Sequence, residues 1–253
     1  ATPLWDEDGK VYLIYAYAGS RSGVNSILVI SELNAEGTEV VSDPVMVFDG
    51  NDGKNHTVEG PKLYKRNGYY YIFAPAGGVA NGWQLVLRSK NIYGPYESKI
   101  VMVQGQTNIN GPHQGGWVDT NTGESWFIHF QDKGAYGRVI HLNPMNWVND
   151  WPVIGADKDQ LGCGEPVTTY KKPNVGKTYP ITTPPESDEF NTRHLGLQWQ
   201  WHANKQDTYG FTTDLGYLRL YAGSLSKEFV NFWEVPNLLM QKFPDEEFTA
   251  TTK

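Results

Sequence analysis

Glu59 is the residue of this sequence best placed to act as a proton donor. It stands in the segment 57–61, Thr-Val-Glu-Gly-Pro, just before a stretch that reads as a β-strand from Lys62 onward. Because Gly-Pro restricts the backbone that follows, the carboxyl group should be held at the mouth of that strand. A buried carboxylic acid with a raised pKa can protonate a leaving glycosidic oxygen. A glutamate that caps a turn is the alternative that the spacing leaves open.

His113 occupies the place in a later repeat that Glu59 occupies in its own. It lies in the segment 110–116, Asn-Gly-Pro-His-Gln-Gly-Gly, before another strand-like stretch. Equivalent places in consecutive propeller blades converge on one axis, so the two side chains are expected to meet. One histidine does not make a metal site, because a hard cation such as Ca²⁺ takes about six to eight oxygen ligands, often including water. An ordinary loop histidine is the alternative.

Arg138 and Trp83 are the two candidates for contacts with a sugar. Arg138 follows a glycine at the start of a strand, where its guanidinium could fork onto hydroxyl groups; a surface salt bridge is the alternative. Trp83 ends the glycine-rich segment 76–83, which is not a phosphate loop because no Lys-Ser/Thr follows it. Aromatic residues make up 13% of the chain, and sugars stack on such rings, but packing within a sheet is at least as good an explanation for Trp83.

The elements that must position these residues are repeated β-hairpins. Three units share a short strand, a polar turn that ends in glycine, and an aromatic-rich strand, and their turn glycines are Gly9, Gly68 and Gly123. Asp-Gly and Asn-Gly turns favour hairpins because both residues tolerate positive φ. A further strand pair follows each hairpin, with strands predicted over 27–32, 85–89 and 139–142. Four strands repeated every 55 to 59 residues predict the blades of a β-propeller.

The sequence therefore predicts an all-β chain with two parts. Residues 1–168 form the C-terminal part of a propeller with about three blades present. Propellers close with roughly 4–8 blades, so further blades are expected on the N-terminal side, and Ala1 is expected to be a cut end. Residues 169–186 form a linker, and residues 187–253 start a β-sandwich. Strands are predicted there over 195–201, 218–222 and 246–251, and residues 233–242 are expected to form one more element.

Composition excludes several classes of partner. The net charge of −7 argues against nucleic acid and against anionic membrane surfaces, since both attract basic patches. No apolar run approaches the roughly 20 residues of a membrane span. Cys163 is the single cysteine, so no intramolecular disulfide can form. The sequence shows no signal peptide and does not decide where the protein resides.

Four segments together resemble family 43 of the glycoside hydrolases. Residues 59–71 (EGPKLYKRNGYYY) are similar to the family's general-acid segment, and residues 88–97 (RSKNIYGPYE) to the stretch that follows it. Residues 111–115 (GPHQG) match the segment whose histidine faces a bound cation, usually calcium, through water. Gly137-Arg138 resembles the segment whose arginine contacts the sugar in the deepest subsite. The region from Asp188 is similar to the start of the β-sandwich in the β-xylosidase and α-L-arabinofuranosidase branches.

This resemblance implies a five-bladed propeller that hydrolyses glycosides with inversion. It makes Glu59 the general acid and assigns His113, through water, to Ca²⁺. The expected reaction is exo-acting removal of xylose or arabinose from hemicellulose, with xylo- or arabino-oligosaccharides as substrates. The family also uses an Asp base and an Asp that tunes the acid's pKa, and neither is found here: Asp6 is interpreted as a turn residue and Glu165 as structural.

The missing aspartates leave two interpretations of the chain. It could work with an N-terminal fragment of the same enzyme, which would carry both residues. Alternatively, it could be a non-catalytic carbohydrate-binding remnant. The sequence does not distinguish xylosidase from arabinofuranosidase, since the pocket walls are expected to lie partly in the absent blades.

Overall fold

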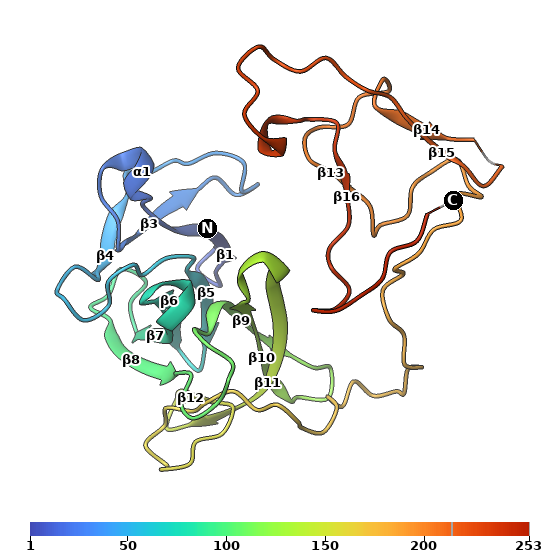
Figure 1. The fold of residues 1–253 in the computed structure, drawn as a ribbon. Coiled ribbons are helices and arrows are strands. Elements are labelled where there is room, and N and C mark those ends of the chain that lie inside the picture. The colour runs from blue at the N-terminus through green and yellow to red at the C-terminus, as the bar shows by residue number, and fades with distance from the viewer. Residues whose placement is uncertain (214, 253) are drawn as a thin grey trace. The chain divides into compact units, whose positions relative to one another are not determined.

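The computed structural model describes residues 1–213 and 215–252 and is built almost entirely from β-strands. The chain divides into two compact units, residues 1–134 with 138–178 and residues 135–137 with 179–253. The first unit contains three four-stranded antiparallel sheets, whose strands run through the blue, cyan and green parts of the ribbon (Figure 1). These sheets are the predicted blades.

The first sheet pairs its strands in chain order, β1-β2-β3-β4. The strands are β1 (Thr2–Trp5), β2 (Val11–Ala16), β3 (Ile27–Leu33) and β4 (Val45–Asp49), and the short helix α1 (Gly19–Ser22) joins β2 to β3. Gly9 has a φ of 83° in the first hairpin, a conformation that glycine adopts at little cost. Its amide donates to the Asp6 carbonyl and closes the predicted turn.

The second sheet repeats this arrangement as β5-β6-β7-β8. Its strands are β5 (Lys62–Arg66), β6 (Tyr69–Ala76), β7 (Trp83–Ser89) and β8 (Glu97–Met102), with helix α2 (Gly78–Asn81) between β6 and β7. Asn67 and Gly68 both have positive φ, at 50° and 74°. Two consecutive left-handed residues produce the tight turn that Asn-Gly predicts.

The third sheet completes the set, with β9 (His113–Asp119), β10 (Ser125–Asp132), β11 (Arg138–Val148) and β12 (Trp151–Ile154). The 3-10 turn η1 (Gly134–Tyr136) joins β10 to β11. Glu59 and His113 thus stand at equivalent places, since one shortly precedes β5 and the other begins β9. The three sheets confirm the predicted repeat.

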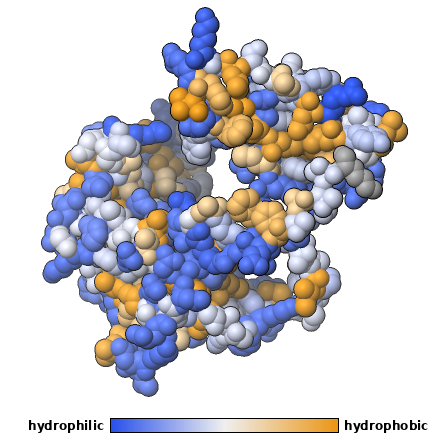
Figure 2. Space-filling view, viewed as in Figure 1, coloured by the Kyte–Doolittle hydropathy of each residue, from blue (hydrophilic) through white to orange (hydrophobic). Residues whose placement is uncertain are grey.

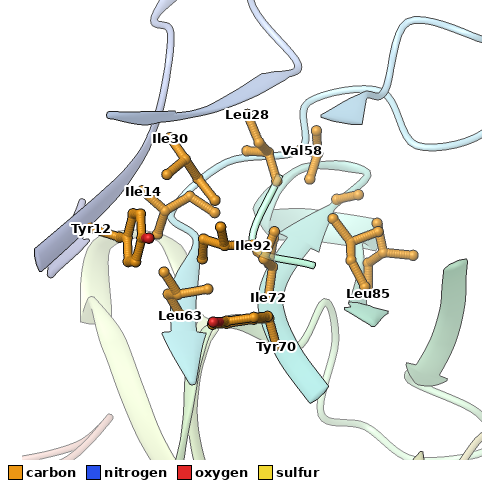
Figure 3. Close-up of a cluster of buried hydrophobic side chains, with 13 residues drawn as sticks. Tyr12, Ile14, Leu28, Ile30, Val58, Leu63, Tyr70, Ile72, Leu85 and Ile92 are labelled. Carbon is orange, nitrogen blue, oxygen red and sulfur yellow. The ribbon is translucent and has the colours of Figure 1, made fainter. Parts of the chain in front are cut away.

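Two hydrophobic clusters hold the sheets together. One joins the first and second sheets and buries Ile14 and Leu28 against Leu63 and Ile72, as Figure 3 shows. The other joins the second and third sheets around Tyr71, Phe73, Phe127 and Met145. Side chains alternate along each strand, so the central sheet packs one face on each neighbour.

Part of the predicted linker lies on the third sheet. The Tyr170 ring contacts the Trp126 ring edge-on, with centroids 5.8 Å apart. Glu124 accepts hydrogen bonds from Lys171 Nζ at 3.1 Å and from the Asn174 amide at 2.8 Å. These contacts tie the chain to the hairpin between β9 and β10, so the first unit extends to residue 178.

The second unit has only short strands. β13 (Gln200–Trp201) pairs with β16 (Leu239–Met240), β14 (Gly210–Thr212) pairs with β15 (Leu218–Leu220), and η2 (Phe232–Glu234) is a 3-10 turn. The strand predicted over 195–201 is confined to its last two residues, and no strand forms over the described residues 246–251. A period-two pattern makes a strand only where a neighbouring strand pairs with it.

Much apolar surface is exposed in this unit, and Figure 2 shows it as orange patches. Leu215 is 79% exposed, Val230 76% and Phe232 73%. None of the helices in the described part of the chain has the length and apolarity needed to cross a membrane.

Candidate active site

The loop that carries Glu59 is anchored on both sides of that residue. Val58 is buried in the cluster between the first two sheets, beside Leu28 in Figure 3. The amide of Glu59 donates to the carbonyl of Pro75 at 3.1 Å, and the amide of Gly77 donates to the carbonyl of His56 at 2.8 Å. The loop therefore pairs with the end of β6, which fixes where the Glu59 side chain starts.

The structure brings Glu59 and His113 into direct contact. Nε2 of His113 lies 2.9 Å from Oε1 of Glu59. The His113 side chain is only 1% exposed, whereas the Glu59 side chain is 52% exposed. Because a carboxylate can only accept, Nε2 carries the proton and donates it when Glu59 is ionised. A buried imidazole thus holds one oxygen of a carboxyl group that faces solvent.

Gln114 is a second donor to the same oxygen, and sequence reasoning missed it. Its Nε2 lies 3.3 Å from Glu59 Oε1. Among the residues that the structure describes, Oε2 of Glu59 makes no hydrogen bond. The only sequence signal was the position of Gln114 beside His113 in a glycine-rich segment. The carboxyl group consequently has one anchored oxygen and one free oxygen.

The electrostatics of this chain favour the ionised form of Glu59. The hydrogen bond from His113 lowers the pKa of the Glu59 carboxyl group, and partial burial opposes this effect without cancelling it. Gln114 and the positive charge of Arg138 lower the pKa further. A general acid that works near neutral pH needs a raised pKa, so the residues described here do not by themselves tune Glu59 for that role.

Arg138 is connected to the site by the Phe130 ring, which lies between Arg138 and His113. Its guanidinium carbon lies 4.6 Å from the centre of the Phe130 ring, and that ring contacts His113 with centroids 5.6 Å apart. The strand register explains this arrangement, because Phe130 of β10 lies opposite His113 of β9. Arg138 is exposed, so its guanidinium is available to a ligand. Phe130 was not singled out from the sequence, where it is one of ten phenylalanines.

Trp83 stands beside the Glu59 loop rather than against the Glu59 side chain. Its ring NH donates to Oδ1 of Asn55 at 3.3 Å, and its ring contacts His56 edge-on at 5.7 Å. A Cβ atom on Gly77 would overlap the Trp83 ring, so this glycine permits the packing. Trp83 belongs to the periphery of the first hydrophobic cluster and supports the loop.

A polar network fixes the segment that precedes His113. Nε2 of Gln131 donates to the carbonyl of Asn108 at 2.8 Å and to Oδ1 of Asn110 at 3.0 Å. Asn110 in turn donates to the carbonyl of Ala80 at 2.9 Å, which joins the segment to helix α2. Gln131 is almost fully buried, so these bonds form away from competing water.

The other two carboxylates considered from the sequence lie elsewhere. Asp6 belongs to the turn after β1 and bonds Lys65 and Tyr70, near the opposite end of β5 from Glu59. Glu165 pairs with Lys158 and accepts from the amide of Gln106 at 2.9 Å, so it joins two loops. Neither residue lies in the group around Glu59.

The described residues of this chain do not form a calcium cage. Within residues 1–213 and 215–252, no group of three or more His, Cys, Asp or Glu side chains could hold a metal ion. Nδ1 of His113 is buried and lacks a hydrogen-bond partner among the described residues. That atom could meet a water molecule, but a lone nitrogen does not match the oxygen-rich shell of Ca²⁺.

Comparison with known sequences identifies both parts of the chain. Residues 1–152 match the profile of glycosyl hydrolases family 43. Residues 187–253 match the profile of the β-xylosidase C-terminal concanavalin A-like domain.

Similar proteins come from several bacteria. A protein of Xylanibacter ruminicola with the provisional name β-xylosidase is 44% identical over 99% of this chain and 45% of its own length. A β-xylosidase of Formosa agariphila is 34% identical over 94% of this chain and 46% of its own length. A non-reducing-end α-L-arabinofuranosidase of Bacteroides ovatus is 30% identical over 64% of this chain and 32% of its own length. This chain spans about half the length of the first two relatives.

Solved structures are similar over both parts. A family 43 glycoside hydrolase of Bacillus licheniformis superposes with a TM-score of 0.75 at 26% identity, over 95% of this chain and 46% of that one. A bifunctional GH43-CE protein of Bacteroides eggerthii gives a TM-score of 0.73 at 30% identity, over 95% of this chain and 30% of that one.

Proposed function

Because this chain belongs to family 43 of the glycosyl hydrolases, we propose that it supplies the general acid of an inverting exo-glycosidase. The observation that carries the proposal is the state of Glu59 on its exposed side chain: Oε1 is bound by two donors, and Oε2 has no hydrogen bond from the described residues. The substrates are xylo- or arabino-oligosaccharides, since the similar proteins are named β-xylosidases and an α-L-arabinofuranosidase.

In the single displacement step, Oε2 of Glu59 gives its proton to the leaving glycosidic oxygen as the bond between that oxygen and the anomeric carbon breaks. A water molecule that loses its proton to the base attacks the same carbon from the opposite face. His113 and Gln114 keep Oε1 in place throughout, because that oxygen accepts hydrogen bonds in both the protonated and the ionised carboxyl group. Arg138 binds hydroxyl groups of the sugar with its forked donors. Trp83 keeps the Glu59 loop in position, and its stacking on a sugar stays a prediction.

Two further carboxylates must come from residues outside this sequence. The lowered pKa of Glu59 requires a nearby negative charge to raise it before it can act as an acid. Inversion also requires a base about 6.5–9.5 Å from the acid, with room for water between them. Thr2 Oγ1 donates to the carbonyl of Pro61 at 2.8 Å, so the start of β1 lies beside the Glu59 segment. An aspartate just before Ala1 in the whole protein would be close to Glu59.

The remaining propeller blades have a surface to pack on. One face of the third sheet carries four apolar side chains that are 40% to 67% exposed: Val118, Ile128, Ile140 and Leu142. We propose that blades from the N-terminal part of the same enzyme cover this face, whether on one chain or on a partner fragment. A sheet face of this composition is normally buried in a propeller.

Calcium would touch this chain only through water. The His113 Nδ1 atom is the group that would contact such a water, while the oxygen ligands would come from elsewhere. Calorimetric titration of this chain with CaCl₂ should therefore show no binding tighter than about millimolar, which is weak for a protein calcium site. Micromolar binding would contradict this.

The test compares the full-length protein with its Glu59→Gln variant on two substrates. Xylobiose has a poor leaving group that needs an acid, whereas nitrophenyl β-xyloside releases a phenolate that needs little protonation. We expect the variant to lose about 100-fold or more of kcat on xylobiose and much less on the nitrophenyl substrate. Glu7→Gln, on a side chain that is 89% exposed, is the control.

Two outcomes would contradict the assignment of Glu59. Equal losses on both substrates would exclude Glu59 as the acid. Full activity of Glu59→Gln on xylobiose would exclude any catalytic role for Glu59.

An NMR spectrum of the first-formed sugar would show which anomer is released and so test inversion. The comparisons do not favour a non-catalytic remnant, and the same assay on α-L-arabinofuranosides distinguishes the two enzyme substrates.

A further inference from the structure

We propose that Gln114 is a positioning residue that locks Oε1 of Glu59, so that Oε2 alone delivers the proton. This inference rests on the proposed function of Glu59 as the acid. His113 supplies the shorter hydrogen bond to Oε1, at 2.9 Å, and Gln114 supplies a second one at 3.3 Å. Two donors on one oxygen fix the rotation of the carboxyl group, which a single donor would leave free to turn.

The Gln114 amide packs against the glycine that follows the acid. Its Oε1 atom lies against the Cα of Gly60, where a Cβ atom would overlap the amide. The Nε2 group of the same amide donates to Oε1 of Glu59 at 3.3 Å. Gly60 directly follows Glu59 in the sequence. Because Gly60 has no side chain, it leaves room for the Gln114 amide beside Glu59.

The backbone at Gln114 is unusual in the same way as the backbone at Gly60. Gln114 has a φ of 49° and Gly60 a φ of 54°, both in the left-handed region. A residue with a side chain seldom adopts this conformation, and where it persists the surrounding structure imposes it. Glycine would satisfy the backbone at position 114 better than glutamine. The presence of glutamine at this position therefore indicates that its amide has a function, which we assign to the hydrogen bond with Glu59.

The amide also has a chemical advantage over an ionisable donor. It neither gains nor loses a proton near neutral pH, so it donates to Oε1 before and after Glu59 releases its proton. The proton on Oε2 leaves with the sugar's oxygen, and the carboxylate that results keeps its bonds to Gln114 and His113. No rotation of the carboxyl group is needed during the step.

The experiment follows the titration of Glu59 by NMR in the 253-residue chain labelled with ¹³C at glutamate carboxyl groups. Glu59→Gln identifies the signal. Gln114→Ala removes the amide and keeps the backbone strain, because alanine also has a Cβ atom at positive φ. Gln114→Gly removes the amide and the backbone strain together. Gln106→Ala, on an exposed glutamine with no side-chain hydrogen bond to Glu59, is the matched control.

We expect the pKa of Glu59 to rise in both Gln114 variants and to stay unchanged in Gln106→Ala. Gln114→Gly should unfold at a higher temperature than Gln114→Ala. In the full-length enzyme, Gln114→Ala should reduce kcat on xylobiose about three- to tenfold, as expected for loss of one hydrogen bond to a charged group.

The inference is overturned if Gln114→Ala leaves the Glu59 titration unchanged. It is also overturned if Gln114→Ala shifts the titration and Gln114→Gly does not, because the backbone would then be the cause. Neither result depends on catalysis. Loss of xylobiose hydrolysis in Glu59→Gln, together with an unchanged titration in Gln114→Ala, would leave the proposed function standing without this positioning role.

Discussion

The side-chain amide of Asn143 donates a hydrogen bond to Nε2 of His129 across 2.8 Å, in the interior of the third sheet. The orientation of the amide follows from its other contact, since Oδ1 of Asn143 accepts from the amide of Val167 at 2.7 Å. Nε2 of His129 must therefore be an acceptor, and the ring proton lies on Nδ1. His129 is 1% exposed, and its surroundings accept only the neutral ring.

This arrangement predicts acid sensitivity. Burial lowers the pKa of His129 from its ordinary value of 6.5 to about 4. Between these values the unfolded chain binds a proton that the folded chain does not, so the free energy of unfolding falls as pH drops from about 6.5 to about 4. The full loss is on the order of 3 kcal/mol. Urea unfolding at several pH values, followed by circular dichroism, measures it.

His129→Gln removes the titrating group and keeps an acceptor for Asn143, so its stability should vary less over this pH range. His202→Gln, in the second unit, is the control and should behave as the unmodified chain does. A pH dependence that is the same in His129→Gln and in the unmodified chain would contradict the assignment.

Asp6 should stabilise the junction of the first two sheets. Burial disfavours its charge, but hydrogen bonds from Lys65 and Tyr70 outweigh that effect and lower the pKa of Asp6. Its side chain is 0% exposed, and removing one partner of a buried pair is costly. We expect Asp6→Ala to lower the free energy of unfolding by about 3 kcal/mol.

The neighbouring residue Glu7 provides a matched comparison. It also contacts Lys65, at 3.3 Å, but its side chain is 89% exposed. Glu7→Ala should change the stability by about 0.5 kcal/mol or less, as exposed ion pairs do. Equal effects of the two substitutions in denaturant unfolding would show that burial does not decide the strength of this pair.

Gly60→Ala and Gly68→Ala should separate stability from site geometry. Both glycines have positive φ, at 54° and 74°, so each alanine should cost about 1 kcal/mol of stability. A Cβ atom at Gly68 meets nothing within 4 Å, whereas one at Gly60 displaces the Gln114 amide. Only Gly60→Ala should therefore raise the pKa of Glu59, which ¹³C NMR detects. A raised pKa in Gly68→Ala as well would mean that the effect is not local.

Arg138 should contribute to substrate binding through its forked donors. Replacing it with lysine keeps the charge and loses the fork, and we expect kcat/KM on xylobiose to fall about 10- to 100-fold in the full-length enzyme. Arg219→Lys is the control, because Arg219 also lies over a phenylalanine, Phe211, at 6.0 Å. Unaltered kinetics in Arg138→Lys would remove Arg138 from the sugar site.

Several features of this protein are determined by its sequence alone. The turn glycines Gly9, Gly68 and Gly123 predicted three hairpins, and the structure has them, because a tight turn with positive φ needs particular residues wherever it occurs. The equivalent positions of Glu59 and His113 followed from the same repeat, and their side chains meet. Local backbone chemistry and a regular period are properties that a sequence carries directly.

Other features depend on contacts between residues distant in the chain. The alternation at 195–201 predicted a full strand, but only Gln200 and Trp201 form one, because a strand exists only where a partner pairs with it. The amide of Gln114 contacts Gly60 and Glu59 because the fold places it against the loop that precedes the second sheet. Which oxygen of Glu59 is free is decided in the same way, since hydrogen bonds between blades depend on positions in space that no local pattern encodes.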